Sequence, residues 1–158
     1  RVKGLAILNI VKIGDEVLRK KCRPVERIDK RICTLLDDMK ETMALASGVG
    51  LAAPQVGVLK RIAIVDNGKE VLELINPEII KEEEVQEGYE ACLSLPGQCG
   101  IVKRPLKVTI KAKDRNGSEI TVFGEGLTAR AFCHELDHLD GKLYIDIASE
   151  MIDESGAE

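Results

Sequence analysis

The two histidines of this 158-residue chain lie four residues apart, in the sequence His134-Glu135-Leu136-Asp137-His138. Residues at this spacing share one face of a helix, so both imidazole rings can bind the same divalent metal ion. The carboxylate of Glu135 lies beside them, where it can exchange protons with a water on that ion. The pattern predicts a metal-dependent hydrolytic site. The simpler alternative is a pair of histidines with only a structural role.

A catalytic metal site usually has three protein ligands, so the two histidines need a partner. Tyr144 occupies the position where a third histidine would fall in an extended motif of this kind. The third ligand is therefore expected upstream, or from a cysteine. Among the five cysteines, Cys92 and Cys99 are the best placed, because they flank turn-forming residues 93–97 that can bring a thiol to the helix. The residues alone leave the choice between these two cysteines open.

Two helices are expected. The first begins after an Asp29 N-cap, repeats apolar residues at helical spacing and ends before Gly48. The second covers about residues 127–140, ends at Gly141 and carries the two histidines.

Strands are expected between the two helices. Residues 61–66 and 71–76 flank Asn67-Gly68, which is a good hairpin turn. Further strands are expected over residues 79–85, 101–113 and 119–123. The predicted class is α+β, with antiparallel strands wrapped around the C-terminal metal-binding helix and an N-terminal helix beside them. We expect one catalytic domain over residues 1–158, with a frayed tail from about residue 147.

The amino-acid composition argues against several classes of binding partner. The formal net charge is −4 and aromatic residues make up 3% of the chain, which argues against a nucleic-acid-binding module. No apolar run is long enough to span a membrane, and no secretory signal is visible. An odd number of cysteines suits a reducing compartment, so a cytoplasmic location is expected.

Three separated motifs resemble those of the peptide deformylase family. They are Gly48-Val49-Gly50-Leu51-Ala52-Ala53-Pro54-Gln55, Glu90-Ala91-Cys92-Leu93-Ser94 and Cys133-His134-Glu135-Leu136-Asp137-His138. The second departs from the usual family sequence, because Ala91 replaces a glycine. If the backbone there needs a positive φ, alanine costs about 1 kcal/mol or more. The resemblance runs from about Ile10 to Ile145, and three motifs in the correct order make it specific.

The resemblance implies a function and a set of roles. Cys92 becomes the third metal ligand beside His134 and His138, and Glu135 becomes the general base and acid. The side chain of Gln55 and the backbone N–H of Leu93 are implied donors to the substrate carbonyl oxygen. The implied reaction is removal of the formyl group from the N-terminal formylmethionine of new polypeptides, with release of formate. The family suggests Fe(II) as the physiological ion, although Zn(II), Ni(II) or Co(II) could occupy the same ligands.

Further residues are expected around this site. Val49, Leu127 and Ala131 are candidates to line an apolar pocket for the methionine side chain, with core packing an equal alternative for Leu127. Gly50 is a candidate to line the substrate site, with the role of a packing glycine as the alternative. Glu90 and Arg104 are expected to pair behind the metal ligands, or else to form a simple surface pair.

The expected partner is the nascent formylated polypeptide, acted on by a monomer in transient contact with the ribosome. Some members of the family that this chain resembles carry a basic C-terminal helix that is thought to contact the ribosome. The tail over residues 150–158 is short and acidic instead, so this mode of docking is not expected here. Two rival functions use the same helix. One is a zinc endopeptidase, which needs a long groove and another third ligand. The other is a closed structural metal site in a binding module.

Overall fold

The computed structural model describes residues 6–154. Its helices are α1 (Lys30–Leu45) and α2 (Leu127–Leu139), with short 3-10 helices η1 (Glu16–Arg19), η2 (Ala53–Val56) and η3 (Tyr144–Asp146). Its strands are β1 (Gly50–Ala52), β2 (Ile62–Asp66), β3 (Val71–Cys92), β4 (Leu95–Lys113), β5 (Glu119–Glu125) and β6 (Glu150–Asp153). All strand pairs are antiparallel, in the order β1-β2-β3-β4-β5, with β6 also paired to β4. The predicted α+β class is confirmed.

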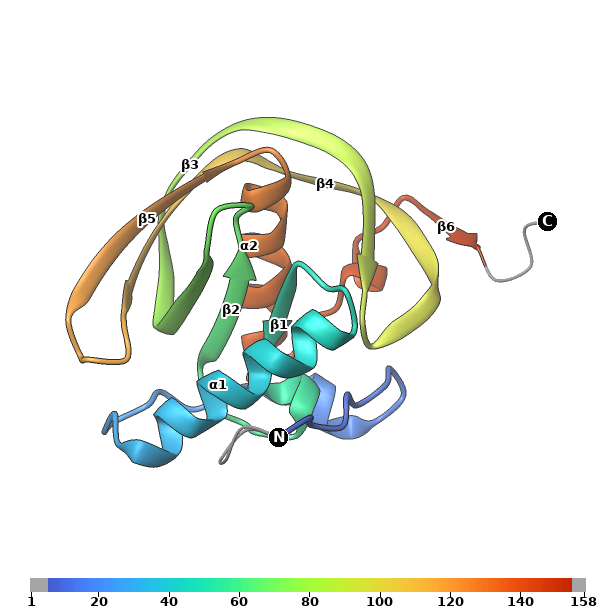
Figure 1. Cartoon of the computed structure of the whole chain (residues 1–158). Helices are drawn as coiled ribbons and strands as arrows, with labels where there is room; N and C mark the ends of the chain where they lie inside the picture. The colour runs from blue at the N-terminus through green and yellow to red at the C-terminus, as the bar shows by residue number, and fades with distance from the viewer. Residues whose placement is uncertain (1–5, 155–158) are drawn as a thin grey trace.

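Strands β3 and β4 form a long hairpin that arches over α2 (Figure 1). Separate strands over residues 71–76 and 79–85 were the wrong expectation, because β3 continues through both. The pairing with β4 shifts between Ile75 and Glu78, where Pro77 lacks an N–H and Asn76 has a φ of 52°. The strand therefore bends at this point instead of ending. Strand β4 likewise begins at Leu95, earlier than the predicted residue 101.

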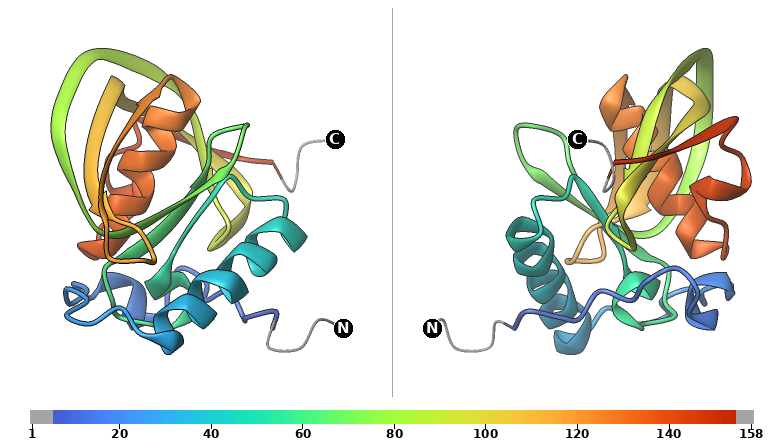
Figure 2. Two further views of the ribbon diagram at one scale, coloured as in Figure 1. Left: turned by 60° about the vertical axis from the view of Figure 1, so that its left-hand side comes forward. Right: turned by 90° about the vertical axis from the view of Figure 1, so that its right-hand side faces the viewer.

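Helix α1 is close to its predicted extent. Its N-cap, Asp29, accepts a hydrogen bond from the backbone N–H of Ile32 at 3.1 Å. The helix lies on one side of the molecule, apart from α2, as both views in Figure 2 show. Its buried face packs on apolar residues of β1, β2 and β3. The buried side chains of this face are Ile32, Leu36, Met39 and Met43.

Helix α2 is buried on nearly every side, and the curved sheet surrounds it. Phe132 and Leu136 pack in one core cluster with Val65, Val108 and Ile110. The sheet comes close to the helix at Gly124, where an added Cβ would lie 2.6 Å from the ring of Phe132. The helix that carries both histidines is therefore held on many sides by the sheet.

The chain end departs from the expected frayed tail. Residues 150–153 form β6, which pairs with residues 98–101 of β4, and Glu154 donates a backbone hydrogen bond to Gly97 at 2.7 Å. This part of β4 has an available edge, because β5 pairs only with residues 107–113. Residues 155–158 lie outside the described part of the chain. None of the described helices is long and apolar enough to cross a membrane.

An ion-pair cluster joins α1 to the sheet and yields a stability prediction. Glu73 of β3 accepts hydrogen bonds from Arg115 at 2.5 and 2.9 Å, and Lys40 of α1 lies 2.6 Å from it. Burial raises the pKa of Glu73, but Arg115 and Lys40 outweigh burial, so the pKa lies below its ordinary value of 4.5. Glu73→Gln should lower the free energy of unfolding at pH 7 by about 1–3 kcal/mol, measured by urea denaturation.

The sign of the pH dependence follows from the lowered pKa. The contribution of Glu73 is fully present above 4.5 and is lost as the pH falls through its lower folded pKa. The difference between Glu73→Gln and wild type should therefore shrink below pH 4.5. Glu70→Gln, at an exposed site in the adjoining turn, is the matched control and should leave stability nearly unchanged. A difference that persists undiminished in acid would contradict the role given to the Glu73 charge.

Candidate active site

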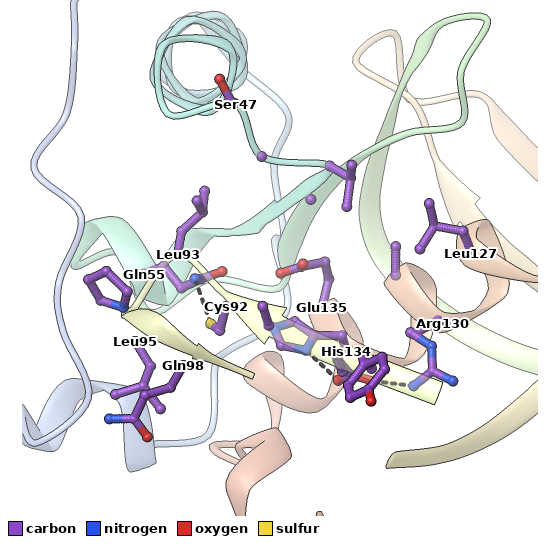
Figure 3. A pocket seen from close by; sticks show the side chains of 18 of the residues that line it. Ser47, Gln55, Cys92, Leu93, Leu95, Gln98, Leu127, Arg130, His134 and Glu135 are labelled. Atoms are coloured by element: carbon purple, nitrogen blue, oxygen red, sulfur yellow. Dashed lines mark hydrogen bonds and ion pairs between the residues drawn. The ribbon is translucent and has the colours of Figure 1, made fainter. Parts of the chain in front are cut away.

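Cys92, His134 and His138 come together although they lie on two distant segments. Their ligand atoms all lie within 4.8 Å of one another, and Cys92 Sγ is 3.3 Å from Nε2 of His138. All three residues are buried. No second group of this kind occurs among residues 6–154, and Cys99, the other candidate, is not part of this one. Figure 3 shows the thiol of Cys92 facing the same space as the ring of His134.

Successive side chains of β3 point to opposite faces of the strand. Glu90 and Cys92, two residues apart, therefore lie on the same face at the end of the strand. Glu90 and Cys92 are buried on the side of α2, while Ala91 between them is exposed. The strand then turns through Leu93 and Ser94 into β4. Ala91 is not among the described non-glycine residues with positive φ. The strain considered for alanine at this position is therefore absent.

A buried carboxylate fixes the orientation of His134. Nδ1 of His134 lies 2.5 Å from one oxygen of Glu90, so the ring donates that N–H and leaves Nε2 available as a ligand atom. Arg104 forms two hydrogen bonds to Glu90 at 2.6 and 3.0 Å and one to Asp137 at 2.7 Å. The alternative of a simple surface pair is wrong, because the side chains of Glu90 and Arg104 are 3% and 6% exposed.

The protonation states of this cluster follow from burial and from charge. Burial would raise the pKa of Glu90, but hydrogen bonds from His134 and Arg104 outweigh it and lower the pKa to about 2. Burial also lowers the pKa of His138 to about 3. The Glu90 carboxylate is thus ionised at neutral pH, and the His138 ring is neutral with a lone pair to donate.

Glu135 lies between the ligand cluster and β1. It is 4% exposed, and its Oε1 has no hydrogen-bond partner among the described residues. Burial raises the pKa of Glu135 to about 7, so its carboxyl group can both accept and donate a proton near neutral pH. Gly50 leaves room for this side chain, because a Cβ at Gly50 would lie 2.5 Å from Oε2 of Glu135.

Both the oxygen and the nitrogen of the Gln55 side-chain amide form hydrogen bonds. Its Oε1 accepts from the backbone N–H of Ala52 at 2.9 Å, which directs Nε2 toward the cluster. Nε2 then donates to Ser94 Oγ at 3.1 Å and to Cys92 Sγ at 3.5 Å. The amide thus presents an N–H group beside the thiol.

A cavity of about 290 Å³ opens over these groups (Figure 3). The cavity is lined by the four residues expected at a substrate pocket, Val49, Gly50, Leu127 and Ala131, and also by Gln55 and Leu93. Leu127 is 67% exposed, so core packing does not explain it. The candidate catalytic residues and the apolar side chains of the wall therefore border the same cavity.

Sequence reasoning missed three residues at this site. Ser94 positions Gln55, Asp137 bonds Arg104, and Arg130 donates from α2 to Glu90 at 3.0 Å. Arg130 lies one turn before His134 on the helix, and this spacing could have indicated it. Ser94 and Asp137 gave no comparable signal, because both lie within motifs already assigned to other roles.

The residues present fit a bound divalent ion. A thiol and two imidazole nitrogens are ligands that zinc and iron accept, and three such ligands leave a further coordination position open. The unpartnered Oε1 of Glu135 is a buried acceptor beside the ligands, where a water would satisfy it. The donor set therefore suits a catalytic rather than a closed structural metal site.

Comparisons with known proteins agree over almost the whole chain. The sequence model of the polypeptide deformylase family matches residues 7–153. The chain belongs to this family. It is 56% identical to the peptide deformylase of Thermoanaerobacter pseudethanolicus over 154 residues, which cover 98% of this chain and 97% of that protein. It is 54% identical to the peptide deformylase of Acetivibrio thermocellus over 154 residues, with 98% and 91% covered.

Solved structures show the same deformylase fold. A peptide deformylase from Legionella pneumophila superimposes with a TM-score of 0.88 at 46% identity, covering 91% of this chain and 87% of that one. One from Synechococcus elongatus, in complex with actinonin, gives a TM-score of 0.88 at 38% identity, with 95% and 85% covered. The resemblance seen in the motifs therefore extends to the complete deformylase architecture.

The space around Gly50 yields a prediction for the activity of this deformylase. Gly50→Ala should lower kcat by roughly 10-fold or more, because the new methyl group displaces the Glu135 carboxylate from the ligands. Formate release and thermal unfolding should be measured together. Gly124→Ala is the matched control, because it creates a similar clash against Phe132 away from Glu135. Gly124→Ala should lower stability without a comparable fall in kcat. Equal losses of kcat in both variants would contradict the role given to the space that Gly50 leaves for Glu135.

The support of His134 by Glu90 yields a second prediction. Glu90→Gln should weaken metal binding by about 10- to 100-fold, because the ring loses its anionic partner. Competition with a chromophoric chelator measures the affinity. Glu87→Gln, an exposed site on the same strand, serves as control and should leave the affinity unchanged. Metal affinity equal to wild type in Glu90→Gln would show that the buried carboxylate does not support the ligand.

Proposed function

We infer that this chain is a hydrolase that removes the formyl group from the N-terminal methionine of new polypeptides. Membership of the deformylase family supports the reaction. The observation that carries the proposal is the convergence of Cys92, His134 and His138 beside Glu135 at the wall of an open cavity. Metal ligands, a proton-transfer group and space for a substrate meet at one place, as amide hydrolysis requires.

Glu135 is proposed as the group that moves the proton. When bound by Cys92, His134 and His138, a divalent ion supplies Lewis acidity and lowers the pKa of water. Glu135 accepts a proton from the attacking water and passes it to the amine nitrogen as the carbon–nitrogen bond breaks. Formate and a free α-amino group result. The pKa of Glu135, near 7, suits both halves of this transfer.

Gln55 and Leu93 are proposed to stabilise the negative charge that develops on the formyl oxygen. The Gln55 amide is already oriented by Ala52, so Nε2 only exchanges its long 3.5 Å contact with Cys92 for one with the formyl oxygen. The backbone N–H of Leu93 is the second proposed donor, from the turn that follows Cys92. One such donor is commonly worth about 3 kcal/mol in the transition state.

We propose Fe(II) as the physiological ion, with Zn(II), Ni(II) and Co(II) able to occupy the same ligands. We also propose that the protein acts as a monomer in the cytoplasm, on chains still near the ribosome, because the substrate is a newly made polypeptide. The family membership and the compact cavity favour this function over a zinc endopeptidase, which would need a long groove.

Two substitutions test the proposed roles. Glu135→Gln should reduce formate release from formyl-Met-Ala by at least ~100-fold while metal content stays at the wild-type level. Cys92→Ser should lose both activity and tightly bound metal, because a serine hydroxyl is a much poorer ligand than a thiolate. Metal content is measured by atomic emission after gel filtration. Wild-type turnover by Glu135→Gln, or full metal retention by Cys92→Ser, would contradict the assignment.

A further inference from the structure

The C-terminal strand brings a carboxylate to the rim of the cavity. Strand β6 pairs with residues 98–101 of β4, and the backbone N–H of Glu154, the next residue, donates to Gly97 at 2.7 Å. Glu154 lines the cavity beside residues 95–98, and it is exposed. The end of the described chain is therefore part of the wall of the proposed active site.

Glu154 differs in charge from the rest of this rim. Among the described residues that line the cavity, it is the only charged one that is exposed. The other exposed residues there are small, apolar or aromatic, for example Ser47, Val49, Tyr89 and Leu127. An entering substrate therefore meets one charged group at the rim, and that group is negative.

No cation of the cavity lining is available to balance this carboxylate. The two basic side chains of the lining, Arg130 and His134, are buried, and both contact Glu90. The charge of Glu154 also reaches inward from the rim. Burial raises the pKa of the Cys99 thiol, and the negative charge of Glu154 raises it further.

The polypeptide that follows the formylated residue must cross the rim. The proposed function places the formyl group beside Cys92 and the first side chain toward Leu127. In Figure 3, Leu95 and Gln98, which lie next to Glu154 in the lining, are on the opposite side of Cys92 from Leu127. A cavity of about 290 Å³ does not hold a longer peptide, so the next residues pass close to the rim. Charges interact there over a Debye length of about 8 Å at physiological salt.

We propose that Glu154 makes this site prefer substrates with lysine or arginine at one of the two residues after formylmethionine, and disfavour aspartate and glutamate there. An ion pair between exposed groups changes an equilibrium constant by up to about 5-fold. The pair is far from the reacting carbon, so it acts on binding and changes KM more than kcat. The inference rests on the proposed function, because it extends the substrate of the same site beyond its first residue.

The test compares peptides that differ only in one charged side chain. The kcat/KM values of formyl-Met-Lys-Ala-amide and formyl-Met-Glu-Ala-amide form one ratio, and those of formyl-Met-Ala-Lys-amide and formyl-Met-Ala-Glu-amide form a second. In wild type the lysine peptide should be preferred in at least one pair, measured in about 0.1 M salt. Glu154→Gln should lower that ratio by roughly 2-fold or more, and Glu154→Lys should bring it below one.

Glu150→Gln is the matched control. Glu150 is an exposed glutamate of the same strand that does not line the cavity, so its loss changes the net charge equally. The ratio in this variant should stay close to wild type, because the two sites are separated by more than a Debye length along the strand. In about 1 M salt the wild-type ratio should fall toward that of Glu154→Gln.

Two results would overturn the role of Glu154. One is that neither ratio changes in Glu154→Gln and Glu154→Lys. The other is an equal fall in Glu150→Gln, which would show an effect of net charge alone. Failure of wild type to release formate from formyl-Met-Ala would instead overturn the proposed function.

Discussion

The structure of this site depends on the buried carboxylate of Glu90. Two arginines and the His134 ring converge on it, which keeps it ionised although it is almost completely buried. An unpaired buried charge would be strongly destabilising, so these contacts must form together. They tie β3, β4 and α2 to one another at the point where the candidate metal ligands Cys92, His134 and His138 meet. The geometry of the site is therefore part of the stability of the fold.

The same arrangement separates the cavity into two chemically different ends. At one end lie Cys92, Gln55 and Glu135, for which we propose the roles of metal ligand, hydrogen-bond donor and proton-transfer group. At the other end Leu127 and Arg130 provide an apolar wall with a single buried cation. Glu90 lies behind both ends, because it contacts His134 and Arg130.

Much of this could be predicted from the sequence. The HExxH spacing placed His134 and His138 on one helix, and Asp29 marked the start of α1. Physical reasoning could not choose between Cys92 and Cys99, because the choice depends on the register of the β3–β4 hairpin; the family resemblance favoured Cys92. The bend at Asn76 and the addition of β6 were missed, since both depend on contacts between distant segments. The contact of Arg130 with Glu90 was missed because the two residues are forty positions apart, although the helical spacing from His134 could have indicated Arg130.

X-ray absorption spectroscopy of the metal-loaded protein tests the central claim most directly, because it reports the atoms around the ion without depending on turnover. The spectrum should show one sulfur and two imidazole nitrogens, from Cys92, His134 and His138, together with at least one exchangeable oxygen, and the sulfur signal should be lost in Cys92→Ser. A spectrum without sulfur, or one with four protein ligands and no exchangeable oxygen, would contradict the claim.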